Sequence, residues 1–334
     1  MAKLNEIIEC AVVIIGVVCL TQGKAGQAKN SIHFLTLGDF GGMPYYPYAT
    51  PIEMAVAKQM SKVADKNPID FVLTLGDNFY FDGVKSVDDP RFTETYSRVF
   101  YQRSLAVDWY MVAGNHDYKG NISAQIAYTK VSKTWKYPDY YYKMAFTIPG
   151  SDMTLEIIMI DTIILCGNTD DEIDLAPSGP VSLTAAKQHW AWLAKQIEQS
   201  TADYVIVAGH YPVLSVGIHG PTKILLDNLQ PLLHANNVTA YFSGHDHNLQ
   251  HLQSSEKASV VDYFVSGAAD TIDPFLKHKA DVPKGALKYF WGKVISLGGF
   301  GRVEVYKENM TFTFMDSFGK TLYQHAMLPR HRRK

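Results

Sequence analysis

Seven short apolar segments recur along the chain, and each has the length of a β-strand. They are rich in β-branched and aromatic residues, and most are almost continuously apolar, as expected of strands covered on both faces. The segments are IHFLTL (32–37), DFVLTL (70–75), DWYMVA (108–113), LEIIMI (155–160), DYVIVA (203–208), VTAYFS (238–243) and DYFVSG (262–267). The pattern predicts a core built from buried strands.

Helical segments lie between these strands. Three of them are predicted at 50–66, 183–197 and 224–235. The first opens with Thr50, Pro51 and Glu53, a capping box with proline at the first helical position. In the third, Pro231 predicts a bend or a division into two helices. Strands that alternate with helices predict an α/β fold.

The last part of the chain, 260–327, is richer in strands, and ENM within GGFGRVEVYKENMTFTFMD is predicted to be a hairpin turn. No Pro/Ser-rich linker divides the chain, so a single domain with mixed sheets is expected over 30–328. Residues 168–181 form an acidic loop containing proline and glycine, which is predicted to be a lid or a processing site.

Residues 1–25 are predicted to be a secretory signal peptide. The apolar block AVVIIGVVCL (11–20) is too short to span a bilayer. Small residues follow it and suit cleavage after Gly23 or Ala25. Glutamates at positions 6 and 9 depart from the usual positive leader, so a signal anchor is the alternative.

Composition and net charge argue against some classes of binding partner. The chain has 334 residues, is 47% hydrophobic and carries a net charge of −2, which removes any global electrostatic case for binding nucleic acid or anionic lipid. Secretion is consistent with three Asn-X-Ser/Thr sequons, of which Asn121, in a polar context, is the predicted glycosylation site. The mature chain would keep one cysteine, Cys166, which predicts a buried thiol rather than an internal disulfide.

Five of the predicted strands end in a glycine followed by a side chain that can bind a metal. The turns are LGD (37–39), LGDN (75–78), AGNHD (113–117), AGHYP (208–212) and SGHDHN (243–248). Glycine permits a sharp turn, and sites in α/β sheets lie beyond the carboxyl ends of the strands. We therefore expect one cluster of ligands, formed by Asp39, Asp77, Asn115, His210, His245 and His247.

These side chains offer oxygen and nitrogen ligands without thiolate, which suits zinc, iron or manganese. Six or more ligands exceed the needs of one tetrahedral ion. They fit two metals that share a bridging carboxylate, an arrangement used for in-line attack on phosphorus.

The succession GD, GDN, GNHD, GH and GHDH resembles the calcineurin-like metallophosphoesterases. The segments GDNFY, AGNHDYKGNISAQIAY, DTIILCGNTDD, AGHYPV, HGPT and GHDHNLQ look like the animal, tartrate-resistant type of purple acid phosphatase. This resemblance implies two mixed β-sheets packed as a sandwich and flanked by helices, in αββα layers. It also implies two iron ions.

By the same resemblance, Asp39, Asp77, Tyr80 and His247 would bind Fe(III). Asp77, Asn115, His210 and His245 would bind a second iron, Fe(II) or Fe(III), or zinc, and Asp77 would bridge the two. A free phenol has a pKa near 10, so only a strongly Lewis-acidic ion would hold Tyr80 as phenolate in acid. Tyr80 therefore predicts an acid pH optimum and a purple colour.

Two further histidines, His116 and His219, match positions that in the family hydrogen-bond phosphate and protonate the leaving group. An imidazolium suits this role in acid. The remaining histidines are interpreted as structural: 33, 189, 234, 251, 278, 325 and 331.

The chain also departs from the family. Relatives pair the cysteine equivalent to Cys166 with one just after HGPT, where this chain has Ile224. Mammalian relatives carry a basic, protease-cut loop over the site, whereas residues 169–188 here contain only Lys187 and no arginine, which argues against activation by cleavage at basic residues. Neither difference touches a predicted metal ligand.

The predicted function is a secreted or lysosomal acid phosphatase. It would hydrolyse phosphate monoesters, of small molecules or phosphoproteins, by metal-hydroxide attack, with peroxide chemistry as an implied side activity. A monomer is expected that binds neither nucleic acid nor, once the signal is removed, membrane. One alternative is a Zn/Mn metallophosphoesterase with phosphodiester or phosphoprotein specificity. Another is a secreted signalling protein on the same fold, against which the intact ligand set argues.

Overall fold

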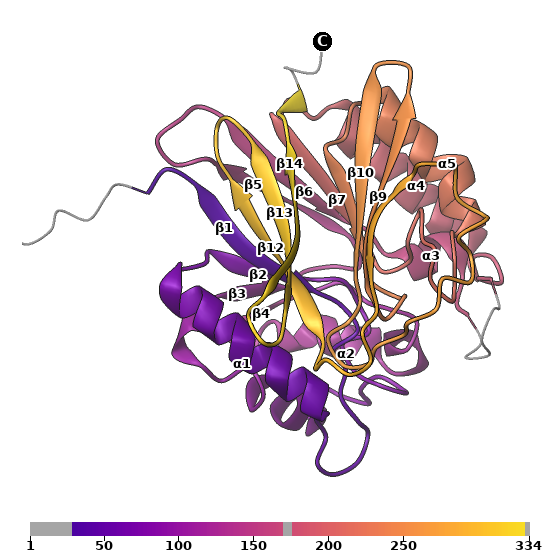
Figure 1. The fold of residues 1–334 in the computed structure, drawn as a ribbon. Helices are drawn as coiled ribbons and strands as arrows, with labels where there is room; N and C mark the ends of the chain where they lie inside the picture. The colour runs from indigo at the N-terminus through magenta and orange to yellow at the C-terminus, as the bar shows by residue number, and fades with distance from the viewer. Residues whose placement is uncertain (1–28, 170–175, 331–334) are drawn as a thin grey trace, which may run out of the picture.

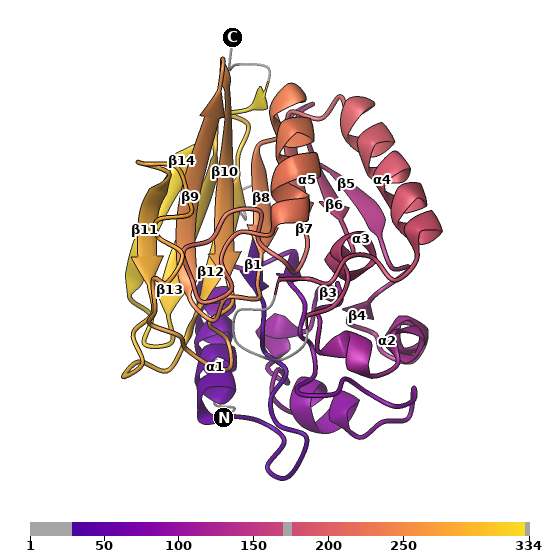
Figure 2. The same cartoon turned by 90° about the vertical axis from the view of Figure 1, so that its right-hand side faces the viewer.

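Two mixed β-sheets of seven strands each face one another (Figures 1 and 2). The computed structural model describes residues 29–169 and 176–330. The predicted signal peptide and its alternative, a signal anchor, lie outside these residues, as does part of the 168–181 loop. Within the described ranges, no helix is both long enough and apolar enough to cross a membrane.

The first sheet has the order β14-β13-β12-β1-β2-β3-β4. Strands β1 to β4 are parallel, and β12 to β14 continue the sheet in antiparallel pairing. The strands are β1 (Ile32–Leu37), β2 (Phe71–Thr74), β3 (Asp108–Tyr110), β4 (Trp135–Lys136), β12 (Gly299–Val305), β13 (Met310–Asp316) and β14 (Thr321–Met327).

The second sheet has the order β11-β9-β10-β8-β7-β6-β5. Its centre, β10-β8-β7-β6, is parallel, and its edges are antiparallel. The strands are β5 (Tyr142–Thr147), β6 (Thr154–Met159), β7 (Tyr204–Ala208), β8 (Ala240–Ser243), β9 (Leu249–Glu256), β10 (Ser259–Ser266) and β11 (Leu287–Trp291).

Helices cover the outer faces of both sheets. Helix α1 lies against the first sheet, and α3, α4 and α5 cover the second (Figures 1 and 2). The helices are α1 (Pro51–Lys66), α2 (Ile122–Tyr128), α3 (Thr162–Cys166), α4 (Leu183–Glu198) and α5 (Lys223–Ala235), with short turns η1 (Phe92–Ser97), η2 (Arg103–Leu105) and η3 (Asp117–Lys119). The expected αββα layers are therefore confirmed.

The apolar character of the central strands follows from burial on both faces. In β7, Tyr204 and Ile206 belong to the core between the sheets, whereas Val205 and Val207 pack with the helices outside the second sheet. Successive side chains of a strand point to opposite faces, so a strand with two covered faces needs apolar residues at every position.

The predicted helices and strands are present in the structure, with two differences. The capping box of α1 is present, with Thr50 Oγ1 accepting from the Glu53 amide at 3.1 Å. Pro231 does not divide the third predicted helix, which is the single helix α5. The turn between β12 and β13 begins after Val305, and Met310 already belongs to β13, so ENM was placed slightly too far along the chain.

Candidate metal centre

The five predicted strand ends meet at one place, but they come from two sheets. Strands β1, β2 and β3 belong to the first sheet, whereas β7 and β8 belong to the second. The Gly38 amide, just after β1, donates to the Ser266 carbonyl at the end of β10 at 2.8 Å, which joins the sheets at this edge. The centre therefore lies across the end of the sandwich.

Glycines of these turns leave room for neighbouring carboxylates, a role that the sequence did not reveal. A Cβ on Gly114 would lie 2.1 Å from Asp77 Oδ1, and one on Gly244 would lie 2.3 Å from Asp39 Oδ2. Either contact would displace a carboxylate. Much of the sharp turning falls on the next residue, since Asp39, Asp77 and His245 have φ values of 58°, 51° and 70°. Such angles cost energy outside glycine and are typical of functional sites.

Asp39, Tyr80 and His247 form one part of the centre. The Tyr80 hydroxyl donates to Asp39 Oδ1 at 3.2 Å and lies 3.0 Å from His247 Nε2. The same His247 nitrogen is 3.5 Å from Asp39 Oδ1. Tyr80 and Asp39 are buried, the His247 side chain is 25% exposed, and the three groups converge on a common point.

Asp77, Asn115, His210 and His245 form the other part. His210 Nε2 lies 2.8 Å from Asn115 Oδ1 and 3.5 Å from Asp77 Oδ2. His210 Nδ1 lies 2.8 Å from the Leu75 carbonyl, which turns Nε2 toward the centre. The ring of His245 is 5.0 Å from that of His210. Asp77 connects the two parts, because Asp39, Asp77 and His210 each place a ligand atom within 4.8 Å of the others.

The donor set and its electrostatics fit bound cations. Burial opposes ionisation of Asp77, but nearby histidines, led by His210, hold its pKa below the usual value. Burial, followed by the charges of Asp39, Asp77 and Asp270, raises the pKa of the Tyr80 phenol well above its usual value. Buried charges need partners, and a multivalent cation would both compensate the carboxylates and permit a Tyr80 phenolate.

His116 and His219 border the centre on different sides. The ring of His116 packs edge-on against Tyr80 at 4.8 Å, and its Nδ1 lies 2.8 Å from the Phe81 carbonyl. The ring of His219 stacks on His245 at 4.1 Å, and its amide donates to Asp246 Oδ1 at 2.9 Å. The two imidazoles are therefore held next to different parts of the ligand set.

Sequence reasoning missed the aspartate that ends one of these motifs, which holds two of the turns in place. Asp117, at the end of GNHD, accepts from the amides of Asn78 (3.0 Å), Phe79 (3.2 Å) and Gly114 (2.8 Å). Gln125 Nε2 donates to the same carboxylate at 2.8 Å. Asp117 thus fixes two ligand turns to each other, and its place inside a quoted motif was the available signal.

Two other supporting residues have no sequence signal. Arg91 donates to the Tyr80 carbonyl at 2.6 Å and also to the Gly41 carbonyl, so it fastens the turns that carry Tyr80 and Asp39. Asp270 follows β10, the next parallel strand after β8, and accepts from Thr50 Oγ1 at 2.7 Å. Both depend on contacts between distant segments.

A sixth strand end carries an aspartate that serves the fold. Asp161 follows β6 and caps α3, where its Oδ1 accepts from the amides of Ile163 (3.0 Å) and Ile164 (2.9 Å). Its Oδ2 accepts from the Tyr118 hydroxyl at 2.7 Å. No glycine precedes Asp161, and an aspartate after a strand therefore does not by itself identify a ligand.

Asp161 leads to a prediction about stability and pH. Burial raises the pKa of Asp161 to about 7, from an ordinary value of 3.8. Between these values the folded chain keeps a proton that the unfolded chain releases, so this contribution is complete below about pH 4 and is lost as the pH rises to about 7. Asp161→Asn, which keeps the capping oxygen, should remove a slope of up to about 1.4 kcal/mol per pH unit.

Urea unfolding of both proteins at pH 5 and pH 7, at equal metal content, measures this slope. Asp65→Asn, at an exposed position of α1, is the matched control and should keep the slope of the parent. The same slope in the parent and in Asp161→Asn would contradict the assignment.

Cys166 is buried, as predicted, and within the described residues it is a free thiol. It belongs to the apolar cluster under α3, α4 and α5, against which Ile224 also packs. Hydrophobic packing therefore occupies the region where the resemblance placed a disulfide.

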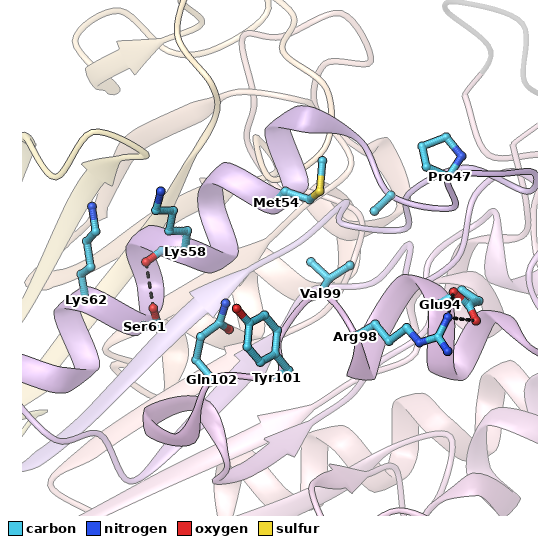
Figure 3. A pocket seen from close by; sticks show the side chains of 11 residues that line it. Pro47, Met54, Lys58, Ser61, Lys62, Glu94, Arg98, Val99, Tyr101 and Gln102 are labelled. Carbon is cyan, nitrogen blue, oxygen red and sulfur yellow. Dashed lines mark hydrogen bonds and ion pairs between the residues drawn. The ribbon is translucent and has the colours of Figure 1, made fainter.

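A cavity of about 640 Å³ lies between α1 and the segment that ends at Gln102. Its lining includes Met54, Lys58, Val99 and Tyr101, and Arg98 at its edge pairs with Glu94 (Figure 3). None of the predicted metal ligands lines it. This cavity is therefore separate from the metal centre.

Known proteins resemble the chain over most of its length. Residues 32–249 match the family model described as Calcineurin-like phosphoesterase. The chain is 46% identical over 315 residues to Tartrate-resistant acid phosphatase type 5 of Homo sapiens, which covers 94% of this chain and 96% of that protein. It is 30% identical over 312 residues to Purple acid phosphatase 7 of Arabidopsis thaliana, covering 91% and 88% respectively.

Among solved structures, the fold is similar to "GAP50 the anchor in the inner membrane complex of Plasmodium". The TM-score is 0.76, with 24% identity and coverage of 90% of each chain. At this identity the similarity supports the fold alone.

Proposed function

We infer the function from the family to which the chain belongs. The similarities establish that it is a calcineurin-like phosphoesterase and, within that family, one of the tartrate-resistant acid phosphatases. It is an acid phosphatase, and its substrates are phosphate monoesters. The observation that carries this function is the gathering of two buried carboxylates, an amide, a phenol and three histidines at the strand ends.

Two cations would be held here. We assign Asp39, Asp77, Tyr80 and His247 to the first, and Asp77, Asn115, His210 and His245 to the second, with Asp77 between them. When bound, such a pair would supply Lewis acidity that lets water lose a proton and attack phosphorus, and positive charge that would stabilise the transferring phosphoryl group.

The protein's own residues would orient the substrate and supply a proton. His116 and His219 flank the ligands, so an imidazolium at either position can donate to a phosphate oxygen or to the leaving alkoxide. The negative charge of the phosphate would be attracted to the positive charge of the loaded site. The hydrogen bonds of Asp117 and Arg91 would keep the turns that carry the ligands fixed during the reaction.

We propose that the ion at the first position is iron. Tyr80 lies among carboxylates that oppose its ionisation. A phenolate there requires an ion of high charge, and Fe(III) meets this need better than a divalent ion. At the second position, iron or zinc suits the N/O donor set.

The cellular setting is also proposed. Residues 1–25 would act as a signal peptide and direct the chain to secretion or the lysosome, and the protein would act as a monomer. Asn121 is exposed at the start of α2, and its Oδ1 accepts from the Ala124 amide at 3.1 Å. A glycan on Nδ2 would leave this cap in place.

The experiment that tests the function combines metal analysis with turnover. The purified mature protein is assayed for iron and zinc, for its visible spectrum with and without reductant, and for hydrolysis of an aryl phosphate and an aryl phosphodiester at pH 5 and pH 7.5. We expect two metals per chain, purple colour and a preference for the monoester in acid. A colourless protein with full iron and no activity near pH 5 would overturn the proposal, and a preference for the diester would favour the Zn/Mn phosphoesterase.

A further inference from the structure

Three side chains outside the metal-centre motifs converge between the two sheets. His251 lies on β9 and Asp262 on β10, which are neighbours in the second sheet, whereas His325 lies on β14 at the edge of the first sheet. The three strands run close together in both views (Figures 1 and 2). Contacts between these side chains therefore join the two sheets.

The spacing of this cluster is compatible with three corners of a tetrahedral metal site. Asp262 Oδ1 lies 3.0 Å from His251 Nε2 and 3.2 Å from His325 Nε2. The three side chains each place a ligand atom within 4.8 Å of the others. Ligands about 2.0 Å from a tetrahedral zinc lie roughly 3.3 Å apart, so small shifts would bring all three into coordination.

Burial and charge favour a cation. His251 and Asp262 are almost fully buried, whereas the His325 side chain is 28% exposed and gives a route from solvent. Burial lowers the pKa of His251, which keeps its imidazole neutral and able to act as a ligand. Burial opposes ionisation of Asp262, but hydrogen bonds from the two histidines hold its pKa below the usual value.

Neighbouring groups orient the candidate ligands. The Tyr323 hydroxyl lies 2.9 Å from His251 Nδ1, so its oxygen can accept a hydrogen bond from Nδ1–H and leave Nε2 to bind a metal. The His251 ring also stacks on Phe264 at 4.4 Å, and Gln253 Nε2 donates to Asp262 Oδ1 at 2.9 Å. Partners of this kind typically support a metal ligand.

We propose that His251, Asp262 and His325 bind a divalent cation of the zinc class, separate from the phosphatase centre. Two imidazoles and one carboxylate form a donor set that suits zinc, with water at the fourth position. The cation would clamp β14 to β9 and β10. None of these residues belongs to the predicted catalytic set, so the proposal stands apart from the phosphatase function.

The test compares the whole iron-loaded protein with its His325→Ala variant. Each is incubated with excess zinc, separated by gel filtration and analysed for zinc and iron by mass spectrometry. We expect about one more zinc per chain in the parent than in the variant, with equal iron and equal phosphatase activity. Gln324→Ala, at the adjacent exposed position of β14, is the matched control and should bind zinc like the parent.

Zinc should also raise the unfolding temperature of the parent and of Gln324→Ala, but not that of His325→Ala, because a ligand that binds only the folded state stabilises it. Equal zinc content in the parent and His325→Ala would overturn the proposal and leave the cluster as a hydrogen-bonded clamp. Anomalous diffraction at the zinc edge, on crystals of the parent, is independent of how the variant folds. A peak between the three side chains supports the site, and its absence overturns it.

Discussion

Asp77→Asn is expected to reduce kcat/KM for an aryl phosphate at pH 5 by more than about 100-fold. Loss of a partner that merely supports a ligand costs about 10–100-fold in metal affinity or activity, and Asp77 is assigned to both cations. The change keeps the shape of the side chain but removes its negative charge from a buried position. The assigned bridge between the two ions would then be weakened at both positions.

Metal analysis separates this effect from misfolding. The variant should hold less than two metals per chain while its far-UV circular dichroism matches that of the parent. Asp65→Asn, at an exposed position of α1, removes the same charge and should keep full metal and full activity. If Asp77→Asn retained two tightly bound metals and near-parental turnover, Asp77 could not be the bridging ligand.

Tyr80→Phe is expected to abolish the visible absorption band of the iron-loaded protein. The phenol oxygen lies between Asp39 Oδ1 and His247 Nε2, so a phenolate there would contact the ion that these residues bind. Phenylalanine keeps the ring packing against His116 but supplies no oxygen. The expected result is colourless protein that still contains iron, with reduced affinity for the first ion.

The measurement is the visible spectrum at matched iron content, with and without reductant. Tyr101→Phe, at an exposed tyrosine, is the control and should remain purple. A purple Tyr80→Phe protein would show that the colour arises elsewhere and would remove the support for Fe(III) at this position. A parent that is colourless but active would indicate divalent ions instead.

The sequence predicted most of the buried strands because their apolar character is continuous. Strands with polar residues among their apolar ones were missed, including β9 (LQHLQSSE), whose Gln250 and His251 are buried, and β14 (TLYQHAM). The capping box of α1 was predicted correctly because all its members lie within four residues of each other. Pro231 does not divide the helix, since the packing of Leu225, Leu229 and Leu233 in the core supports α5 on both sides of the proline.

Five candidate ligands could be named from sequence for a local reason: Asp39, Asp77, Asn115, His210 and His245 each follow a glycine at the end of an apolar strand. The convergence of the ends could be expected too, but only within one sheet. In the structure, Asp39, Asp77 and Asn115 approach from the first sheet and His210, His245 and His247 from the second. That arrangement depends on how two sheets pack, which no spacing along the chain records.

The strand ends, the chemistry of their side chains and the family could be read from the sequence, because these are encoded in short contiguous segments. Only the tertiary structure decided which polar residues support the centre, among them Arg91 and Asp270, and which histidines gather elsewhere. His251 and His325 looked like unrelated structural residues until β9 and β14 were placed beside each other around Asp262. The physical reason is that strand pairing and sheet packing join residues distant in sequence, and the free energy that selects this packing is spread over the whole core.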